Sequence, residues 1–236
     1  MRKQADADAL VAEGNTLIRP VLFDVTDAAR APAVAKEVAA TLRAEGRSLA
    51  ALINNAGISG SQKVVAFAGA EHYESVLATN VAGMARVTET LLPLLQAFPG
   101  GGARIVNIGS FVGSLAPALQ FIGPYVASKF AVEGVSDMWR RTLKPTGVAV
   151  SLVKPGSFAT GMNQLANADP DLSPVIDAVH DAVTSPRPLA RYYPGQIKGT
   201  SCSVFCKLFL VIPDCIADRA IALIGTEDNT RHLDAV

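Results

Sequence analysis

The chain has 236 residues, of which 50% are hydrophobic and 18% are charged, and its 21 basic side chains balance 21 acidic ones. This length suits a single α/β domain that buries a sizeable core. The neutral charge balance argues against a nucleic-acid-binding protein. The three cysteines, at positions 202, 206 and 215, lack the spacing and the histidine partners of a zinc site, so we expect no bound metal and reduced, packed thiols.

The N-terminus has no apolar stretch of the kind that forms a secretory signal, which predicts a cytoplasmic protein. The longest apolar run covers residues 204–212, but Lys207 interrupts it and Pro213 ends it. It is far shorter than the roughly 20 residues that span a bilayer. We therefore expect no transmembrane segment, and we interpret this run as an apolar wall or part of the core.

The first half of the chain predicts helices and strands in alternation. Residues 3–13 form a predicted helix with Leu10 and Val11 on its apolar side, and residues 17–24 form a predicted strand that ends at Asp24. A predicted helix over 28–45 follows. Residues 49–53 are continuously apolar, as in a strand that is buried on both faces of a parallel sheet.

The second half continues the alternation. Helical periodicity covers residues 70–98, although Gly83 and Pro93 weaken it, and a predicted strand follows at 103–108. A helix through Tyr125 then leads to a predicted strand at 148–153. This order predicts one doubly wound, Rossmann-like α/β domain over residues 1–236, with its ligand site at the carboxyl ends of the strands.

Polar and glycine-containing segments follow four of the predicted strands. Asp24, residues 54–57, Ser110 and residues 154–157 each stand directly after a strand. Because the carboxyl ends of parallel strands meet at one edge of the sheet, these segments are expected to share a binding site.

The sequence Tyr125-Val-Ala-Ser-Lys129 places a phenol and an ammonium four residues apart on a predicted helix. Positions i and i+4 are neighbours on a helix surface, so the Lys129 charge is expected to lower the pKa of Tyr125. A phenol with a lowered pKa can act as a general acid or base near neutral pH. Taken alone, the same spacing also fits an exposed amphipathic helix.

Five short motifs occur together and in order: Asn54-Asn-Ala-Gly57, Asn80-Val-Ala-Gly83, Asn107-Ile-Gly-Ser110, Tyr125-Val-Ala-Ser-Lys129 and Pro155-Gly-Ser-Phe-Ala-Thr160. With them, the chain resembles a short-chain dehydrogenase/reductase. The segment Ala190-Arg-Tyr-Tyr-Pro-Gly195 resembles the branch that contains retinol and 17β-hydroxysteroid dehydrogenases. The resemblance implies an oxidoreductase that moves a hydride between a nicotinamide cofactor and a lipophilic secondary alcohol or ketone.

The resemblance also implies roles for four side chains. Tyr125 exchanges the substrate proton, Lys129 lowers its pKa and holds the cofactor ribose, Ser110 hydrogen-bonds the substrate oxygen, and Asn80 holds a proton-relaying water. Each has a plainer alternative: Asn80 can satisfy backbone groups at a helix irregularity, and Ser110 can be a loop or cap residue. Ser114 is a rival for the serine role.

The cofactor is expected to be NADP or NAD, with NADP favoured because Arg2 suits a ribose 2′-phosphate. The resemblance assigns Asp24 and Val25 to the adenine, and Pro155, Gly156 and Thr160 to the nicotinamide side. The remaining contacts, to the adenosine ribose and the cofactor backbone, are Asn54, Ala56 and Gly57. The three histidines, at 72, 180 and 232, match nothing in the pattern and are interpreted as surface or partly buried residues.

One part of the family pattern is absent from this sequence. The family begins with a strand, a TGxxxGxG turn and a helix, whereas here no glycine precedes Gly14. Without that turn, no loop of backbone N–H groups holds the pyrophosphate. We hypothesise that Met1 is an internal start. We also expect lowered stability, poor cofactor affinity, and a 17–24 strand that either pairs with the 49–53 strand or is loosely held.

Residues 1–160 are thus expected to form the cofactor and catalytic part, and residues 161–236 the substrate side. An apolar wall is predicted from Phe158, Leu165, Phe205, Leu208, Phe209 and Leu210.

A homodimer or homotetramer is expected through the helices at 71–98 and 124–144. The alternative function is a catalytically silent fragment or pseudoenzyme that acts through this association.

Overall fold

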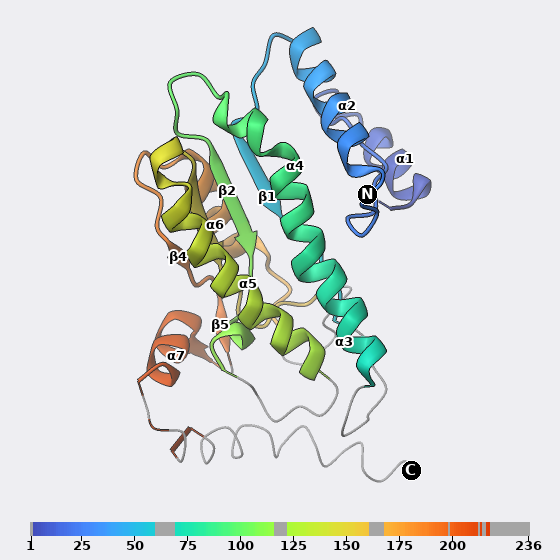
Figure 1. Ribbon diagram of the computed structural model, residues 1–236. Helices are drawn as coiled ribbons and strands as arrows, with labels where there is room; N and C mark the ends of the chain where they lie inside the picture. Colours follow the sequence, from blue (N-terminus) through green and yellow to red (C-terminus); the bar gives the residue numbers. More distant parts are fainter. Residues whose placement is uncertain are drawn as a thin grey trace.

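The computed structural model describes residues 2–59, 69–115, 122–160, 168–197, 199–211, 213 and 216–217. A parallel sheet runs through its centre in the strand order β1-β2-β3-β4 (Figure 1). Its strands are β1 (Ala51–Asn54), β2 (Arg104–Ile108), β3 (Ala149–Val153) and β4 (Arg191–Tyr192). Strands β1, β2 and β3 fall within the strands predicted at 49–53, 103–108 and 148–153, apart from Asn54 at the end of β1, and the predicted α/β fold is confirmed.

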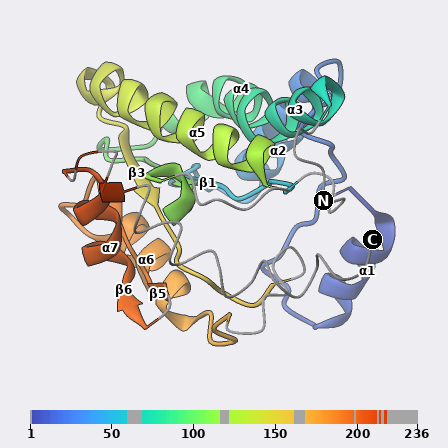
Figure 2. The ribbon, with the colours of Figure 1, turned by 90° about the horizontal axis from the view of Figure 1, so that it is seen from below.

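Helices cover both faces of the sheet (Figure 2). On one face lie α3 (Ala70–Leu77), α4 (Met84–Gln96) and α5 (Gly123–Thr142), and α6 (Ser173–Thr184) lies on the other face. Two earlier helices, α1 (Gln4–Ala12) and α2 (Ala31–Ala44), precede the sheet, and α2 packs against α4. Near the C-terminal end are the short strands β5 (Gln196–Ile197) and β6 (Thr200–Ser201), followed by α7 (Cys202–Phe209).

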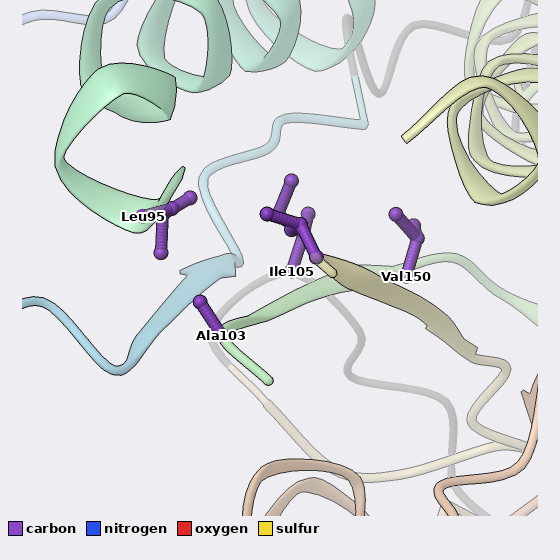
Figure 3. Packing of buried hydrophobic residues seen from close by; sticks show 5 residues of the cluster. Leu95, Ala103, Ile105 and Val150 are labelled. Carbon is purple, nitrogen blue, oxygen red and sulfur yellow. The ribbon is translucent and has the colours of Figure 1, made fainter. Parts of the chain in front are cut away.

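Alternating side chains of β2 build two separate cores. Ile105 is fully buried on the side of α4 and α5, where Leu95, Ala103 and Val150 surround it (Figure 3). The next residue, Val106, points to the opposite face and packs in the cluster that contains Ala182 of α6. Successive side chains of a strand point to opposite faces, so a strand buried on both sides must be apolar at nearly every position.

The predicted 70–98 helix is divided by a π-helical segment, η1 (Ala78–Gly83), between α3 and α4. Gly83 ends this segment and packs against Val25, because a Cβ atom built on it would lie 2.7 Å from the Val25 Cγ2 atom. Arg86, one turn later, donates a hydrogen bond of 2.5 Å to the Val25 carbonyl. The irregular turn therefore holds the chain after residue 24 against the sheet-covering helices.

The predicted strand at 17–24 is wrong. Residues 18–24 have no strand hydrogen bonding, and among the described residues nothing pairs with the outer edge of β1. An apolar run becomes a strand only beside a backbone partner, and here Asp24 instead closes a turn with Thr26. The expected apolar side of the first helix is also wrong at Val11, which is 60% exposed, because no element of the described chain covers it.

Strand β1 also has an exposed apolar side chain on the α6 face of the sheet. Ile53 lies on the face that α6 covers further along the sheet, yet its side chain is 46% exposed. On this face α6 contacts β2 and β3, whereas α4 contacts β1 on the opposite face. Strand β1 is therefore covered on the α4 side and exposed at Ile53 on the other side.

Candidate active site

Ser110 and Tyr125 meet at the carboxyl end of β2. Ser110 follows this strand, is 7% exposed, and begins the 3₁₀ turn η2 (Phe111–Gly113) by accepting a hydrogen bond from the Val112 amide. Its hydroxyl interacts with the hydroxyl of Tyr125, in the first turn of α5, and this interaction lowers the pKa of the phenol. The rival, Ser114, turns away from Tyr125 toward Lys154 and Glu133. The geometry therefore favours Ser110 over Ser114 as the partner of the phenol.

Lys129 lies one turn after Tyr125, and its side chain is only 7% exposed. Its ammonium donates a hydrogen bond of 2.8 Å to the Ile108 carbonyl and lies 5.4 Å from the centroid of the Tyr125 ring. Burial lowers the pKa of Lys129 from 10.5 to about 8, since a charged group is poorly solvated inside the protein. The ammonium is still mostly protonated at pH 7.

The expectation that Lys129 lowers the pKa of Tyr125 is wrong in the protein without cofactor. Burial raises the pKa of the phenol above 10.0, and the hydrogen bond with Ser110 offsets only part of this rise. The Lys129 ammonium points to the Ile108 carbonyl and lies beside the ring, so it does not counter the cost of burying a phenolate. The phenol is therefore protonated at neutral pH.

Asn80 satisfies backbone groups at the helix irregularity, and its role in holding a proton-relaying water stays a prediction. Its side chain is 3% exposed within η1, accepts a hydrogen bond from the Ile58 amide at 2.8 Å and donates to the Ile58 carbonyl at 2.9 Å. A further bond of 2.9 Å reaches the hydroxyl of Ser128, beside Lys129. Asn80 thus fixes the loop after β1 to the helix that carries the Tyr125 and Lys129 side chains.

A buried chain of polar side chains connects the strands beneath the site. Asn54 donates to Asn107 at 2.8 Å and to Thr88 at 2.9 Å, and Asn107 donates to Ser136 at 2.9 Å. These bonds join β1, α4, β2 and α5. Of the predicted cofactor contacts, Asn54 is thus occupied by protein partners, and Gly57 approaches Asn80, whose Oδ1 atom would lie 3.4 Å from an added Cβ atom.

The loop after β3 stands opposite Ser110. The Phe111 amide donates to the Pro155 carbonyl at 3.1 Å, and the Gly156 amide donates to the Pro194 carbonyl at 2.9 Å. A Cβ atom on Gly156 would lie 2.4 Å from the Gln196 carbonyl oxygen, so only glycine fits here without a shift of the main chain. The nicotinamide-side segment is therefore placed at the same sheet edge as Ser110 and Tyr125.

The other predicted cofactor residues are not brought to this centre in the same way. Asp24 accepts hydrogen bonds from the amide and the hydroxyl of Thr26, which lower its pKa. Val25 packs on Gly83, Ala56 is exposed in the loop after β1, and Thr160 is exposed at the end of the described segment 122–160. Leu165, Cys215 and His232 lie outside the described residues.

The predicted apolar wall is divided between core and surface. Phe158 is 5% exposed, whereas Leu208 and Leu210 are 51% and 64% exposed. Phe205 packs on a small cluster formed by Ile197, Cys202 and Cys206, with Phe209 4.8 Å away between ring centroids. The two described cysteines are buried free thiols, in agreement with their predicted packing role.

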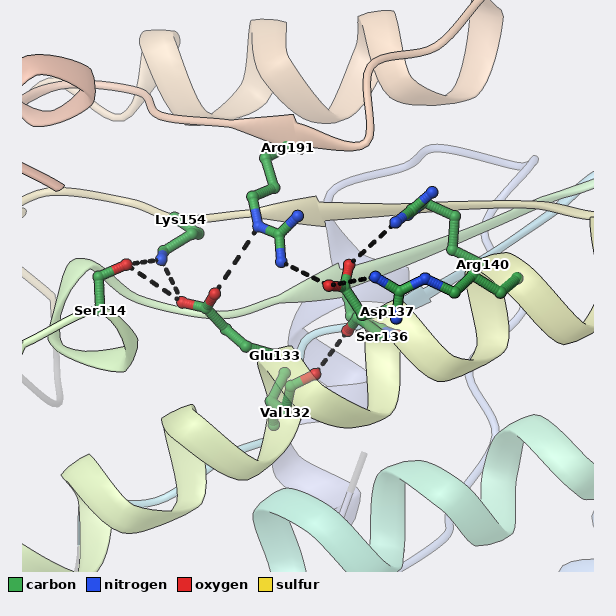
Figure 4. A network of polar contacts seen from close by, with 10 residues as sticks. Ser114, Val132, Glu133, Ser136, Asp137, Arg140, Lys154 and Arg191 are labelled. Atoms are coloured by element: carbon green, nitrogen blue, oxygen red, sulfur yellow. Dashed lines mark hydrogen bonds and ion pairs between the residues drawn. The ribbon is translucent and has the colours of Figure 1, made fainter. Parts of the chain in front are cut away.

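Sequence reasoning missed a network of charges next to the site (Figure 4). Glu133 of α5 contacts Lys154, and its other oxygen lies 3.7 Å from the Arg191 Nε atom. Arg191 also pairs with Asp137 at 3.0 Å. Burial alone raises the pKa of Asp137, but the hydrogen bond and charge of Arg191 outweigh it and lower this pKa. The signal was present: Glu133 and Asp137 continue the four-residue spacing of Tyr125 and Lys129.

The Lys129 ammonium has hydrogen-bond donors that fit the nicotinamide ribose of a dinucleotide cofactor. Among the described residues, Lys129 makes a single hydrogen bond, to Ile108, which leaves two N–H groups for ribose hydroxyls. The phosphate end fits less well, because in the described part of the chain no glycine-rich turn opens onto a helix N-terminus.

Comparison with known proteins identifies the family. The family model described as short chain dehydrogenase matches residues 1–171. The chain belongs to the short-chain dehydrogenase family. It is therefore an enzyme of the NAD(P)-dependent dehydrogenase class by descent, and the fold and family predictions are confirmed.

Curated relatives support the predicted branch. Retinol dehydrogenase 5 of Mus musculus is 31% identical over 228 residues, which cover 80% of this chain and 69% of the relative. The 17-beta-hydroxysteroid dehydrogenase type 6 of Homo sapiens is 38% identical over 122 residues, 52% of this chain and 37% of the relative. The chain thus spans between about a third and about two thirds of the length of these relatives.

A solved structure supports the fold. The short-chain dehydrogenase from Streptomyces avermitilis has a TM-score of 0.73 and 26% identity, with 98% of this chain and 87% of that chain covered. In the described part of this chain, none of the helices has the length and apolar character that crossing a bilayer requires. The described residues also contain no group of three or more metal-ligating His, Cys, Asp or Glu side chains.

Proposed function

We propose that this protein catalyses NAD(P)-dependent interconversion of a lipophilic secondary alcohol and the corresponding ketone, with Tyr125 as the general acid and base. The observation that carries the proposal is that Ser110 and Lys129 both adjoin Tyr125: the Ser110 hydroxyl interacts with the phenol and lowers its pKa, and the Lys129 ammonium lies 5.4 Å from the centroid of the ring. A carbonyl oxygen placed between the two hydroxyls would accept from both.

The residues of the chain supply proton transfer and charge stabilisation. A bound nicotinamide supplies or accepts the hydride. In the direction of reduction, the carbonyl oxygen gains the Tyr125 proton as its carbon gains the hydride, and Ser110 stabilises the negative charge that develops on the oxygen. Lys129 orients the cofactor ribose with the N–H groups that the bond to Ile108 does not use. Burial keeps Tyr125 protonated at neutral pH, the form that donates.

The substrate class is inferred from the family branch and from the apolar C-terminal part. Relatives named as retinol and 17-beta-hydroxysteroid dehydrogenases support a large apolar substrate. Val204, Leu208 and Leu210 present exposed apolar side chains on and after α7, beyond the loop that follows β3. We propose NADP as the preferred cofactor because Arg2 offers a cation for a 2′-phosphate, and residues 161–236 as the substrate side.

Cofactor titration followed by turnover tests the proposal. The purified chain is titrated with NADPH and NADH by fluorescence, and each complex is then mixed with a panel of steroid, retinoid and simple cyclic ketones. We expect weak binding that favours NADPH, together with cofactor oxidation that depends on an apolar ketone. Binding without oxidation of cofactor by any ketone would contradict the proposed reaction.

The second candidate is a catalytically silent protein that associates through α3, α4 and α5. The open edge of β1 among the described residues favours it. The same titration separates the two functions. No fluorescence change at millimolar NADPH or NADH, together with a stable dimer or tetramer in sedimentation, would favour the silent protein.

A further inference from the structure

Lys154 is the largest fully buried side chain in the described residues, with 1% of it exposed. Its ammonium contacts the Ser114 hydroxyl and the Glu133 carboxylate and lies 5.6 Å from the centroid of the Tyr193 ring. A buried ion pair is seldom a net source of stability, because both charges lose their water. The proposed proton-transfer steps do not use Lys154, so its place in the fold calls for a different role.

The main chain of Lys154 is firmly held. Its amide donates to the Tyr192 carbonyl at 2.8 Å, which extends the pairing between β3 and β4. Its carbonyl accepts a hydrogen bond from the Cys202 thiol at 3.3 Å. Strand β4 and helix α7 thus fix the base of the side chain, and the ammonium extends from this base to α5 (Figure 4).

The turn from Ser110 to Ser114 is held at both ends. Ser110, at the first end, interacts with the Tyr125 hydroxyl, and Ser114, at the last end, donates to Glu133 at 3.4 Å and contacts Lys154. Between them, the Phe111 carbonyl accepts from the Ser114 amide at 3.0 Å. Because the turn is short and internally bonded, a displacement of Ser114 is transmitted to Ser110.

We propose that Lys154 is a positioning residue that holds Ser110 against Tyr125 by fixing the far end of the Ser110–Ser114 turn to Glu133. Glu133 lies two helical turns after Tyr125 on α5. Both ends of the turn therefore meet the same helix. Ser110 meets it at Tyr125, and Ser114 meets it at Glu133, where Lys154 contacts both side chains. This inference rests on the proposed function in so far as it concerns turnover.

Replacement of Lys154 by methionine tests this role, because methionine keeps most of the length and loses the charge. Glu133 then retains the Ser114 hydroxyl at 3.4 Å and the more distant Arg191 at 3.7 Å, and both Glu133 and Ser114 lose the buried cation. We expect kcat to fall about tenfold, with the Kd for NADPH changed less than about twofold. The fall in kcat should not exceed that of Ser110→Ala, which we expect to be about 10²- to 10³-fold, the usual effect of removing one donor to the reacting oxygen.

A measurement without cofactor separates this proposal from the proposed reaction. In protein labelled with ¹³C at the tyrosine Cζ carbon, Tyr125→Phe identifies the Tyr125 resonance, and Ser110→Ala shows the shift caused by losing the hydrogen bond. We expect Lys154→Met to move the resonance in the same direction. In the Ser110→Ala background, Lys154→Met should cause no further movement of the resonance and no further fall in kcat.

Two more variants keep the test decisive. Ser114→Ala keeps the contact between Lys154 and Glu133 but cuts its link to the turn, so it should shift the Tyr125 resonance as Lys154→Met does. It replaces Lys154→Met if that variant does not fold. Lys144→Met, which removes an exposed lysine, is the matched control and should leave the resonance unchanged. The proposal would be overturned if Ser114→Ala left the Tyr125 resonance unchanged. It would also be overturned if Lys154→Met changed the resonance and kcat by the same amounts in the wild type and in the Ser110→Ala background.

Discussion

Replacement of Lys129 by methionine should stabilise the protein without cofactor and remove part of its pH dependence. The buried ammonium of Lys129 has a pKa of about 8 in the folded chain, against 10.5 for the exposed side chain. Because the unfolded chain binds this proton more tightly, folding stability rises as the pH rises through the window from about 8 to 10.5. Below this window, the folded protein bears the full cost of the buried charge.

The magnitude follows from the two pKa values. At 1.36 kcal/mol for each tenfold change, the difference between 10.5 and about 8 gives a cost of about 3 kcal/mol at pH 7. About 2 kcal/mol of this cost disappears by pH 9.5 as the folded side chain loses its proton. Methionine also loses the hydrogen bond to Ile108, worth about 1 kcal/mol. The variant should thus be more stable by about 2 kcal/mol at pH 7 and about equal in stability at pH 9.5.

Urea unfolding followed by circular dichroism at pH 7 and pH 9.5 measures this difference. The comparison includes Lys144→Met, an exposed lysine, which should match the wild type at both pH values within about 0.5 kcal/mol. The same stability difference between Lys129→Met and the wild type at both pH values would refute the reasoning, because Lys129 would then not be a desolvated ammonium.

Three further predictions concern the packing around the site. In urea unfolding, Gly156→Ala should destabilise the fold by about 1–3 kcal/mol, because the new Cβ atom would lie 2.4 Å from the Gln196 carbonyl oxygen. The matched variant Gly134→Ala, whose Cβ atom would meet nothing within 4 Å, should stabilise α5 by about 0.5–1 kcal/mol. Ile105→Ala should cost about 2–5 kcal/mol in the same assay, and Ile53→Ala, at a site 46% exposed, less than about 1 kcal/mol. Asn107→Ala should lower the thermal midpoint by an amount that corresponds to about 2 kcal/mol, since it removes two hydrogen bonds, from Asn54 and to Ser136, in the protein interior.

The sheet and the strand-end site could be predicted because each depends on a local pattern. Strands β1, β2 and β3 are mostly apolar segments, and their parallel pairing brings Asn54, Ser110 and Lys154 to one edge. The spacing of Tyr125 and Lys129 likewise required only a helix. These features follow from side-chain periodicity and from the direction of parallel strands.

Other features depend on partners that the local sequence does not specify. The run at 17–24 is apolar enough for a strand, but whether it becomes one depends on a neighbouring backbone, and the described structure provides none. The sign of the Tyr125 pKa shift depends on how deeply the phenol is buried and on where the Lys129 ammonium points. The ion pair of Lys154 with Glu133 joins residues from separate elements, and neither residue stands in a motif.

The most direct test of the account compares Tyr125→Phe with Tyr73→Phe, a matched removal of a hydroxyl from an exposed tyrosine of α3. Single-turnover oxidation of bound NADPH by the best ketone of the panel is measured at saturating cofactor. The account predicts that Tyr125→Phe binds NADPH within about twofold of the wild type and loses about 10²–10⁴ in the rate of turnover, while Tyr73→Phe retains it. A Tyr125→Phe variant that oxidises NADPH at the wild-type rate would contradict the central claim.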